Sequence, residues 1–205
     1  RNELPKTADN NGIPVKLING IFTIDDNGTI AIDHIQANLL QKGSLKIAGD
    51  IRTSEQTLNL TATIAQLTSS DALSTALAPT LNGSLKATGT FAAPQINWQL
   101  ATDRAQSTGS LKIATDTKNA QRTLLLENAN IKANNGGEVQ LAGKLELFQN
   151  QKLALQVSSQ NFNPSALYPS FPQGNISGKI QATGELAKRQ IHSELNFAPS
   201  TLSGA

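Results

Sequence analysis

The chain has 205 residues, with 17 basic and 15 acidic side chains spread along its length and a net charge of +2. A protein that neutralises a phosphate backbone gathers its basic side chains on one face, so nucleic acid is excluded as an expected partner. The absence of Cys excludes disulfides and thiolate metal sites, and no run of about 18 apolar residues is available to span a bilayer. Because the first residue is Arg1 and not Met, we expect an excised segment whose signal or membrane anchor lies outside it.

Apolar and polar residues alternate over many short stretches, which is typical of strands with one buried and one solvated face. The pattern predicts about a dozen strands. The apolar positions expected on one face are, in chain order, Leu45, Ile47, Ile51, Leu58, Leu60, Ile64, Leu85, Phe91, Ile96, Trp98, Leu100, Leu111, Ile113, Leu124, Leu126, Val139, Leu141, Leu145, Leu147, Leu153, Leu155, Val157, Ile176, Ile180, Leu186, Ile191, Leu195 and Phe197.

Turn residues separate these stretches. Asp25 to Gly28 (DDNG) and Asn134 to Gly137 (NNGG) are strong hairpin signals, because Asn, Asp and Gly tolerate positive φ. Consecutive strands are therefore predicted to be antiparallel. Asn82 and Gly83 also resemble a turn, but the alternation runs through them, so we assign them to the interior of a strand.

Two short stretches interrupt the alternation and predict helices. The first runs from Ser70, as N-cap, to Leu77, and Pro79 ends it. The second runs from Asn163 to Tyr168, with Asn163 as the cap and Pro164 at the first helical position. Both are too short to cover the sheet.

The sequence repeats itself about 95 residues apart. LNGSLKATGTF (81–91) aligns with ISGKIQATGEL (176–186), and GSLKIAGDI (43–51) aligns with GEVQLAGKL (137–145). We therefore predict one domain over residues 1–205, with repeat 1 at about 13–106 and repeat 2 at about 107–200.

The predicted fold class is all-β: one long antiparallel sheet with two short helices. A sheet with one apolar face must bury that face, and the chain offers neither a helical layer nor a second set of sandwich strands. We expect the sheet to curl over itself into an open groove. Gly49, Gly89, Gly143 and Gly184 lie on the apolar face, where they favour curvature, room for a guest, or both.

Two features of the sequence resemble the TamB family. One is the strand motif G-x-[LI]-x-[AL]-x-G-x-[LF], as in GSLKATGTF (83–91) and GKIQATGEL (178–186). The other is the segment NFNPSALYPSFPQGNISGKI (161–180). This family is the subunit of the translocation and assembly module within the AsmA-like bridge proteins. The resemblance covers most of residues 15–200. It implies a β-taco in the periplasm of a Gram-negative bacterium, within a chain anchored in the inner membrane.

The resemblance also implies a function, namely phospholipid transport between the inner and outer membranes, with the apolar positions above lining the groove. A lining of Leu, Ile and Val replaces one apolar solvent for an acyl chain with another. Phospholipid acyl chains are thus one expected partner, and an outer-membrane β-barrel assembly protein is the other. The alternative for the same residues is a packed hydrophobic core, without lipid, that forms between the two sides of the curled sheet.

Two rival functions remain. A chaperone-like subunit would assist outer-membrane protein assembly by adding strands to the sheet edges, expected near residues 15–24 and 189–198. A β-helix adhesin is disfavoured, because its rungs are much shorter than the repeat seen here.

Residues for catalysis are missing from the sequence. His34 and His192 lack metal-ligand or triad spacing, and Asp25 and Asp26 are explained by the hairpin turn. We predict no enzymatic activity, no cofactor and no metal.

Overall fold

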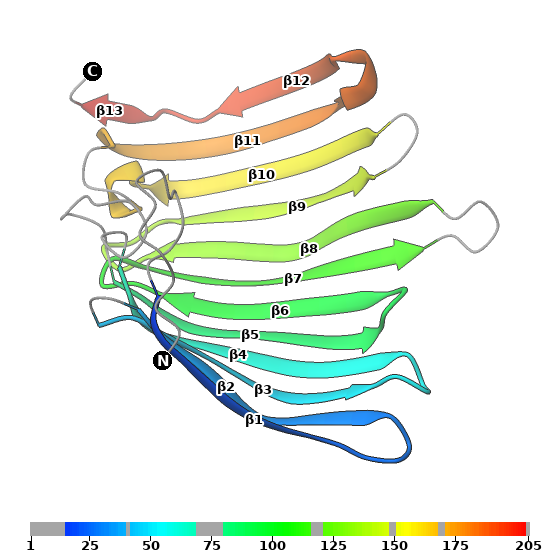
Figure 1. Ribbon diagram of the computed structural model, residues 1–205. Helices are drawn as coiled ribbons and strands as arrows, with labels where there is room; N and C mark the ends of the chain where they lie inside the picture. Colours follow the sequence, from blue (N-terminus) through cyan, green and yellow to red (C-terminus); the bar gives the residue numbers. More distant parts are fainter. Residues whose placement is uncertain are drawn as a thin grey trace, which may run out of the picture.

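The computed structural model describes residues 15–39, 42–68, 80–115, 121–147, 151–167 and 171–203. These residues form one antiparallel sheet in which the first twelve strands pair in chain order, whereas the short thirteenth strand pairs with the eleventh. The strands are β1 (Val15–Ile24), β2 (Thr29–Leu39), β3 (Ser44–Arg52), β4 (Thr57–Leu67), β5 (Leu81–Thr90), β6 (Pro94–Ala101), β7 (Ala105–Thr115), β8 (Arg122–Ala133), β9 (Glu138–Glu146), β10 (Lys152–Phe162), β11 (Gln173–Glu185), β12 (Gln190–Phe197) and β13 (Thr201–Ser203). Figure 1 shows them stacked in chain order.

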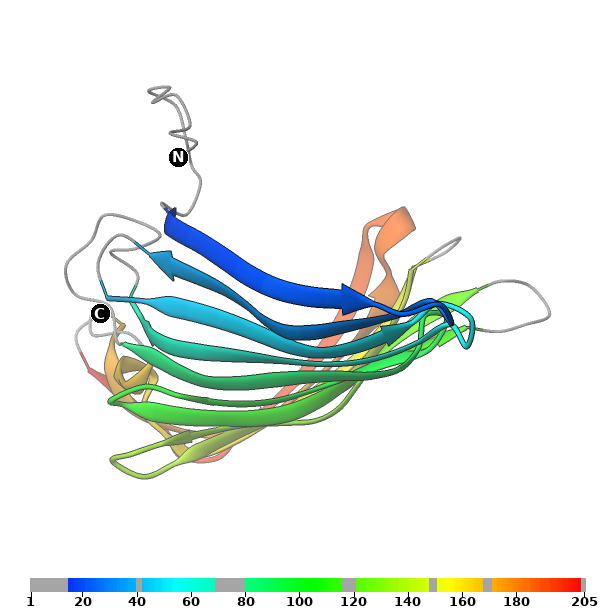
Figure 2. The same cartoon turned by 60° about the horizontal axis from the view of Figure 1, so that its bottom comes forward.

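The sheet is curled and does not close. Figure 2 shows it bending from β1 down to the middle strands and rising again toward β12. The outer edges of β1 and β12 do not pair with each other, and the short β13 pairs with the start of β11. The all-β antiparallel prediction is confirmed, and so are the two edges expected near residues 15–24 and 189–198.

The predicted hairpin turns lie where the Asn, Asp and Gly residues indicated. Asp25 Oδ1 accepts hydrogen bonds from the backbone N–H groups of Asn27 (3.0 Å) and Thr29 (2.7 Å), and Gly28 has φ of +76°. Between β8 and β9, Gly136 also takes a positive φ, of +94°. Asn82 and Gly83 lie inside β5, as the alternation predicted.

The two predicted helices fare differently. Residues 70–77 lie outside the described part of the chain. The helix predicted over 163–168 is not confirmed: residue 168 lies outside the described part, and residues 163–167 contain a single 3₁₀ turn, η1 (Pro164–Ala166), in which Leu167 N–H bonds to Pro164 O. Asn163 caps this turn as predicted, through its Oδ1.

A second 3₁₀ turn, η2 (Leu186–Lys188), was not predicted, and it corrects the placement of Leu186 in a strand. It ends at Arg189, which takes the left-handed conformation with φ of +55° and reverses the chain into β12. Leu186 therefore lies in the hairpin connection and not in the sheet.

Full burial is confined to a few places. One cluster consists of Ala133, Phe162 and Ala166, with Ile131 and Val139 packed against it. It lies under η1 at one end of the sheet, and the two ribbon views place η1 on the concave side. Ile131 and Val139 are paired residues of β8 and β9, so the apolar face is the concave one here. In the described ranges, no helix is long and apolar enough to cross a membrane.

Candidate functional site

The strand register joins the apolar residues into continuous rows across the sheet. Residues directly opposite each other in an antiparallel pair project to the same face. One row crosses every strand from β1 to β12, and its residues are apolar or glycine as far as β11, before it ends at a serine: Phe22, Ile32, Gly49, Leu60, Ala87, Ile96, Leu111, Leu126, Gly143, Leu155, Ala182 and Ser193. The candidate site is this apolar face, which is formed by such rows.

A parallel row lies two residues away on most strands, and three residues away on β2 and β8, where a bulge intervenes. It crosses β1 to β7 through Gly20, Ile35, Ile47, Ala62, Leu85, Trp98 and Gly109. On the other half of the sheet it continues through Ala129, Leu141, Val157, Ile180 and Leu195. The alternation read from the sequence therefore does project to one face.

The expected lining residues lie on this face wherever they belong to a strand. Phe91, Leu147 and Leu186 do not, because they follow β5 and β9 or form η2. Phe91 is 46% exposed, in the connection between β5 and β6. Most of the others are half-buried, whereas Ile191 and Leu195 are 55% exposed on the last long strand.

Sequence reasoning missed the contribution of β1 and β2 to the apolar face, together with part of β8. The missed residues are Ile18, Phe22, Ile24, Ile30, Ile32, Ile35, Ala129 and Ile131. Register shifts between Ile32 and Ile35, and between Leu126 and Ala129, explain part of the omission. Such bulges break the period of two, although alternation at Ile30 and Ile32 was readable.

Trp98 shows how closely this face is filled in the middle of the sheet. It pairs with Gly109 on β7, and a Cβ at residue 109 would overlap the indole ring. The indole Nε1–H donates a hydrogen bond to Ser107 Oγ at 3.1 Å. Trp98 therefore lies along the sheet surface instead of standing up from it.

Residue 49 must be a glycine for two reasons, its backbone conformation and the lack of space for a side chain. Its φ is +137°, which side-chain-bearing residues rarely adopt, and a Cβ would overlap Asn59 O on β4. The glycine expected to allow curvature is thus needed for the close approach of β3 and β4. It also leaves a gap between Ile32 and Leu60 in their row.

A small apolar hollow of about 140 Å³ lies on the concave side. Its lining includes Leu81, Leu100, Ala105, Ile131 and Leu167. This volume is below the roughly 300 Å³ at which small-molecule pockets begin. The apolar face is therefore an extended surface, and no second layer of the described residues covers it.

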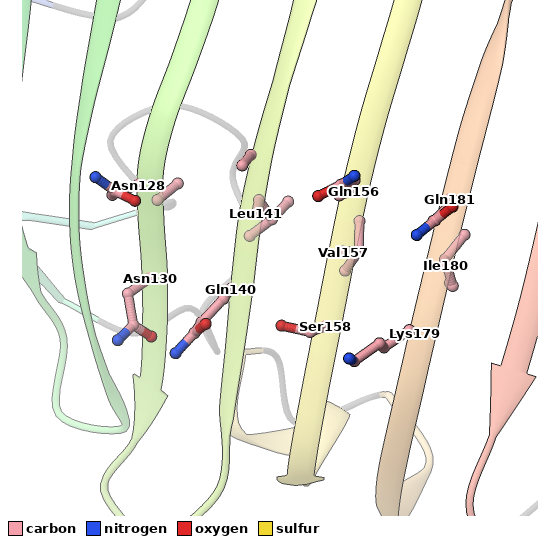
Figure 3. A pocket seen from close by; sticks show the side chains of 12 residues that line it. Asn128, Asn130, Gln140, Leu141, Gln156, Val157, Ser158, Lys179, Ile180 and Gln181 are labelled. Carbon is pink, nitrogen blue, oxygen red and sulfur yellow. The ribbon is translucent and has the colours of Figure 1, made fainter.

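The opposite, convex face is polar. Asn130, Gln140, Ser158 and Lys179 form one of its rows across β8 to β11. Figure 3 shows these side chains around an open hollow of about 420 Å³. Asn130 Oδ1 is buried there without a hydrogen-bond partner among the described residues. This amide-lined hollow was not predicted, because the sequence pattern marks only which face is polar.

The titratable groups of the described residues form no catalytic arrangement. His34 Nδ1 lies 2.9 Å from Asp33 Oδ2 at the surface. His192 lies on β12, where it pairs with Thr183 of β11 and is exposed to solvent.

 Within the described ranges, no three His, Cys, Asp or Glu side chains gather into a group that could hold a metal ion.

One carboxyl group has a perturbed pKa. The Lys188 ammonium lies 2.7 Å from Glu185 Oε2, and this hydrogen-bonded contact lowers the pKa of Glu185. The pair joins the end of β11 to η2, so it belongs to the hairpin connection and not to the apolar face.

Comparison with known proteins adds no relative. No family model, no curated protein and no solved structure matches the chain.

Proposed function

We propose that the concave apolar face carries phospholipid acyl chains, and that the chain is a periplasmic segment of a TamB-like bridge between the inner and outer membranes. The observation that supports this most is the row of apolar and glycine residues that crosses every strand from β1 to β11. In this proposal the membrane anchor lies outside the segment, and the segment performs no chemical reaction.

The energetics of such a face suit transport better than storage. An acyl chain of about 16 carbons is stabilised by roughly 12 kcal/mol when it leaves water for an apolar lining. Because the rows repeat similar aliphatic side chains on successive strands, neighbouring positions bind a chain about equally well. A lipid can then move between strands without crossing water, while its headgroup stays at the open side.

The proposal includes two copies of a six-stranded β-taco unit, β1 to β6 and β7 to β12. Hydrogen bonds that recur about 95 residues apart support it. Gln66 N–H donates to Asn82 Oδ1 at 2.8 Å, and Asn161 N–H donates to Ser177 Oγ at 2.8 Å. Gln56 and Gln151, at matching places, both have positive φ, of 54° and 49°.

A photo-crosslinking experiment tests the proposal. Leu141 lies on the concave face and its neighbour Gln140 on the convex face of the same strand, so the two positions form a matched pair. A benzophenone side chain at residue 141, in the full-length protein in cells, should capture phospholipid. The same group at residue 140 should capture little. Equal capture at both positions, or capture at 140 alone, would contradict the proposal.

A charge on the apolar face provides a second test. Leu141→Asp should reduce lipid capture by a reporter at Ile180, because a carboxylate in the row raises the cost of placing a hydrocarbon beside it. Gln140→Asp is the control on the opposite face. Unchanged capture in a folded Leu141→Asp protein would count against an acyl-chain passage.

The alternative function is assistance to outer-membrane protein assembly by strand addition. The unpaired edges of β1 and β12 favour it, because unpaired backbone groups can template a partner strand. Crosslinkers on β1 or β12 that capture an outer-membrane protein, with no lipid captured at residue 141, would favour this alternative.

A further inference from the structure

A polar row crosses the convex face, alongside the apolar rows of the concave face. It runs through every strand from β1 to β12, and each of its side chains ends in an amide, a hydroxyl or an ammonium group: Asn19, Gln36, Lys46, Thr63, Ser84, Gln99, Thr108, Asn130, Gln140, Ser158, Lys179 and Asn196. The row contains two lysines and no carboxylate, although the chain has 15 acidic residues against 17 basic ones. Uncharged hydrogen-bonding groups therefore dominate it.

Hollows lie along the polar row on both halves of the sheet. The amide-lined hollow of Figure 3, of about 420 Å³, includes the residues of the row on β8 to β11. Another hollow, of about 410 Å³, includes Ser84, Gln99 and Thr108 on β5 to β7. Both volumes exceed the roughly 300 Å³ at which ligand pockets begin. Hollows at separate places on one row suit an elongated ligand that lies across the strands.

The amide-lined hollow has hydrogen-bonding capacity that the fold does not use. Within the described ranges, the side chains of Gln156 and Gln181 form no hydrogen bond, and Asn130 Oδ1 is buried without a donor. By contrast, Gln95 Nε2 on the same face donates a hydrogen bond to Ser110 Oγ at 3.1 Å. A buried acceptor without a donor costs free energy, so a ligand that supplies the donor is stabilised in this hollow.

These groups restrict the chemistry of the ligand. An amide both donates and accepts hydrogen bonds, and so does a sugar hydroxyl, whereas an ionised carboxylate only accepts them. Because the Asn130 acceptor requires a donor, it favours hydroxyl groups over anionic groups. A nucleic acid would need far more than the two lysines of the polar row. A protein partner is disfavoured as well, because protein interfaces are rich in aromatic, Met and Arg side chains and the row has none.

We propose that the polar row and the amide-lined hollow bind an uncharged glycan chain, which lies across the strands on the convex face. In the hollow, sugar hydroxyls donate to Asn130 Oδ1 and bond the amides of Gln156 and Gln181, while Lys179 donates to a sugar oxygen. The apolar rows lie on the opposite face, so a glycan and an acyl chain can be bound at the same time. The inference does not depend on lipid binding.

Calorimetric titration of the full-length protein with cello-oligosaccharide and chito-oligosaccharide tests the proposal. At least one of these sugars should bind, and added salt should change the affinity little, because the ligand is uncharged. The double variant Gln156→Ala and Gln181→Ala should weaken binding about tenfold or more, because two hydrogen bonds are lost. Asn59→Ala is the matched control and should bind as the unaltered protein does. Asn59 is an exposed amide on the same face, outside both hollows, and its Nδ2 is already bonded to Asp50 Oδ2 at 3.2 Å.

The opposite results would overturn the proposal. If neither sugar binds, the hollow holds water alone. Equal or tighter binding of polyacrylate, a polyanion without hydroxyl groups, would indicate charge attraction to the lysines. Equal affinity in the double variant and in Asn59→Ala would place the sugar elsewhere. The altered glutamines are exposed, so these substitutions should leave the fold intact, which circular dichroism checks. Lipid capture at residue 141 is measured separately and can fail independently.

Discussion

Trp98 of β6 and Gly109 of β7 face each other, and the indole ring occupies the volume that a Cβ at residue 109 would need. The ring is held in place by the Nε1–H hydrogen bond to Ser107 Oγ, on the same strand as the glycine. A large side chain on one strand is thus matched to a missing side chain on the next. This relationship keeps the Trp98 ring low on a face that consists mostly of aliphatic side chains.

The first prediction concerns this pair. Gly109→Ala should destabilise the protein by about 1–3 kcal/mol, because the added methyl group displaces the indole ring. In a Trp98→Ala background the same change should cost much less. Urea unfolding of the four proteins in the cycle measures the coupling, and additive effects would show that the two residues do not interact.

The second prediction concerns the cap of η1. Asn163 Oδ1 accepts hydrogen bonds from Ser165 N (3.1 Å), Ser165 Oγ (2.9 Å) and Gly174 N (3.1 Å). Asn163→Ala should cost about 1–2 kcal/mol in unfolding free energy, because these donors lose their acceptor. Asn163→Asp keeps an acceptor oxygen and should retain most of the stability. Equal loss in both variants would contradict a capping role.

The third prediction concerns Gly49. Gly49→Ala should cost about 2 kcal/mol or more, because both its φ of +137° and the nearby Asn59 O disfavour a side chain. Gly136 also has a positive φ, but a Cβ there would meet nothing within 4 Å, so Gly136→Ala should cost less. Thermal unfolding compares the two. A smaller loss at residue 49 would be evidence against the close approach of β3 and β4.

The fourth prediction concerns pH. Because Lys188 lowers the pKa of Glu185 in the folded state, the pair contributes stability above the ordinary carboxyl pKa and loses it as pH falls through the lowered value. Lys188→Gln should raise the pKa of Glu185 in an NMR titration. The stability difference between the two proteins should be present at neutral pH and vanish in acid. A constant difference across that range would exclude the ion pair as its cause.

The parts of the fold that depend on neighbouring residues in the sequence were predictable. Alternation at residues such as Leu58 and Leu60 placed strands and faces, and the Asp25 to Gly28 turn indicated an antiparallel hairpin. The bulges between Ile32 and Ile35 and between Leu126 and Ala129 were missed, since they depend on how a partner strand is paired. The turn η2 was also missed. It ends at Arg189 in the left-handed conformation, a position where Gly or Asn would have indicated a turn in the sequence.

The candidate site was predictable as a set of side chains and not as a shape. A period of two determines which residues share a face, because successive side chains on a strand project to opposite sides. That information is in the sequence alone. A curled, open sheet with edges near residues 15–24 and 189–198 was expected from the uncovered apolar face, but the extent of the curl and the exposure of the side chains on β1 and β12 came only from the tertiary structure. The physical reason is that twist and curvature are small at each strand pair and accumulate over the whole sheet, so no short stretch of sequence specifies them.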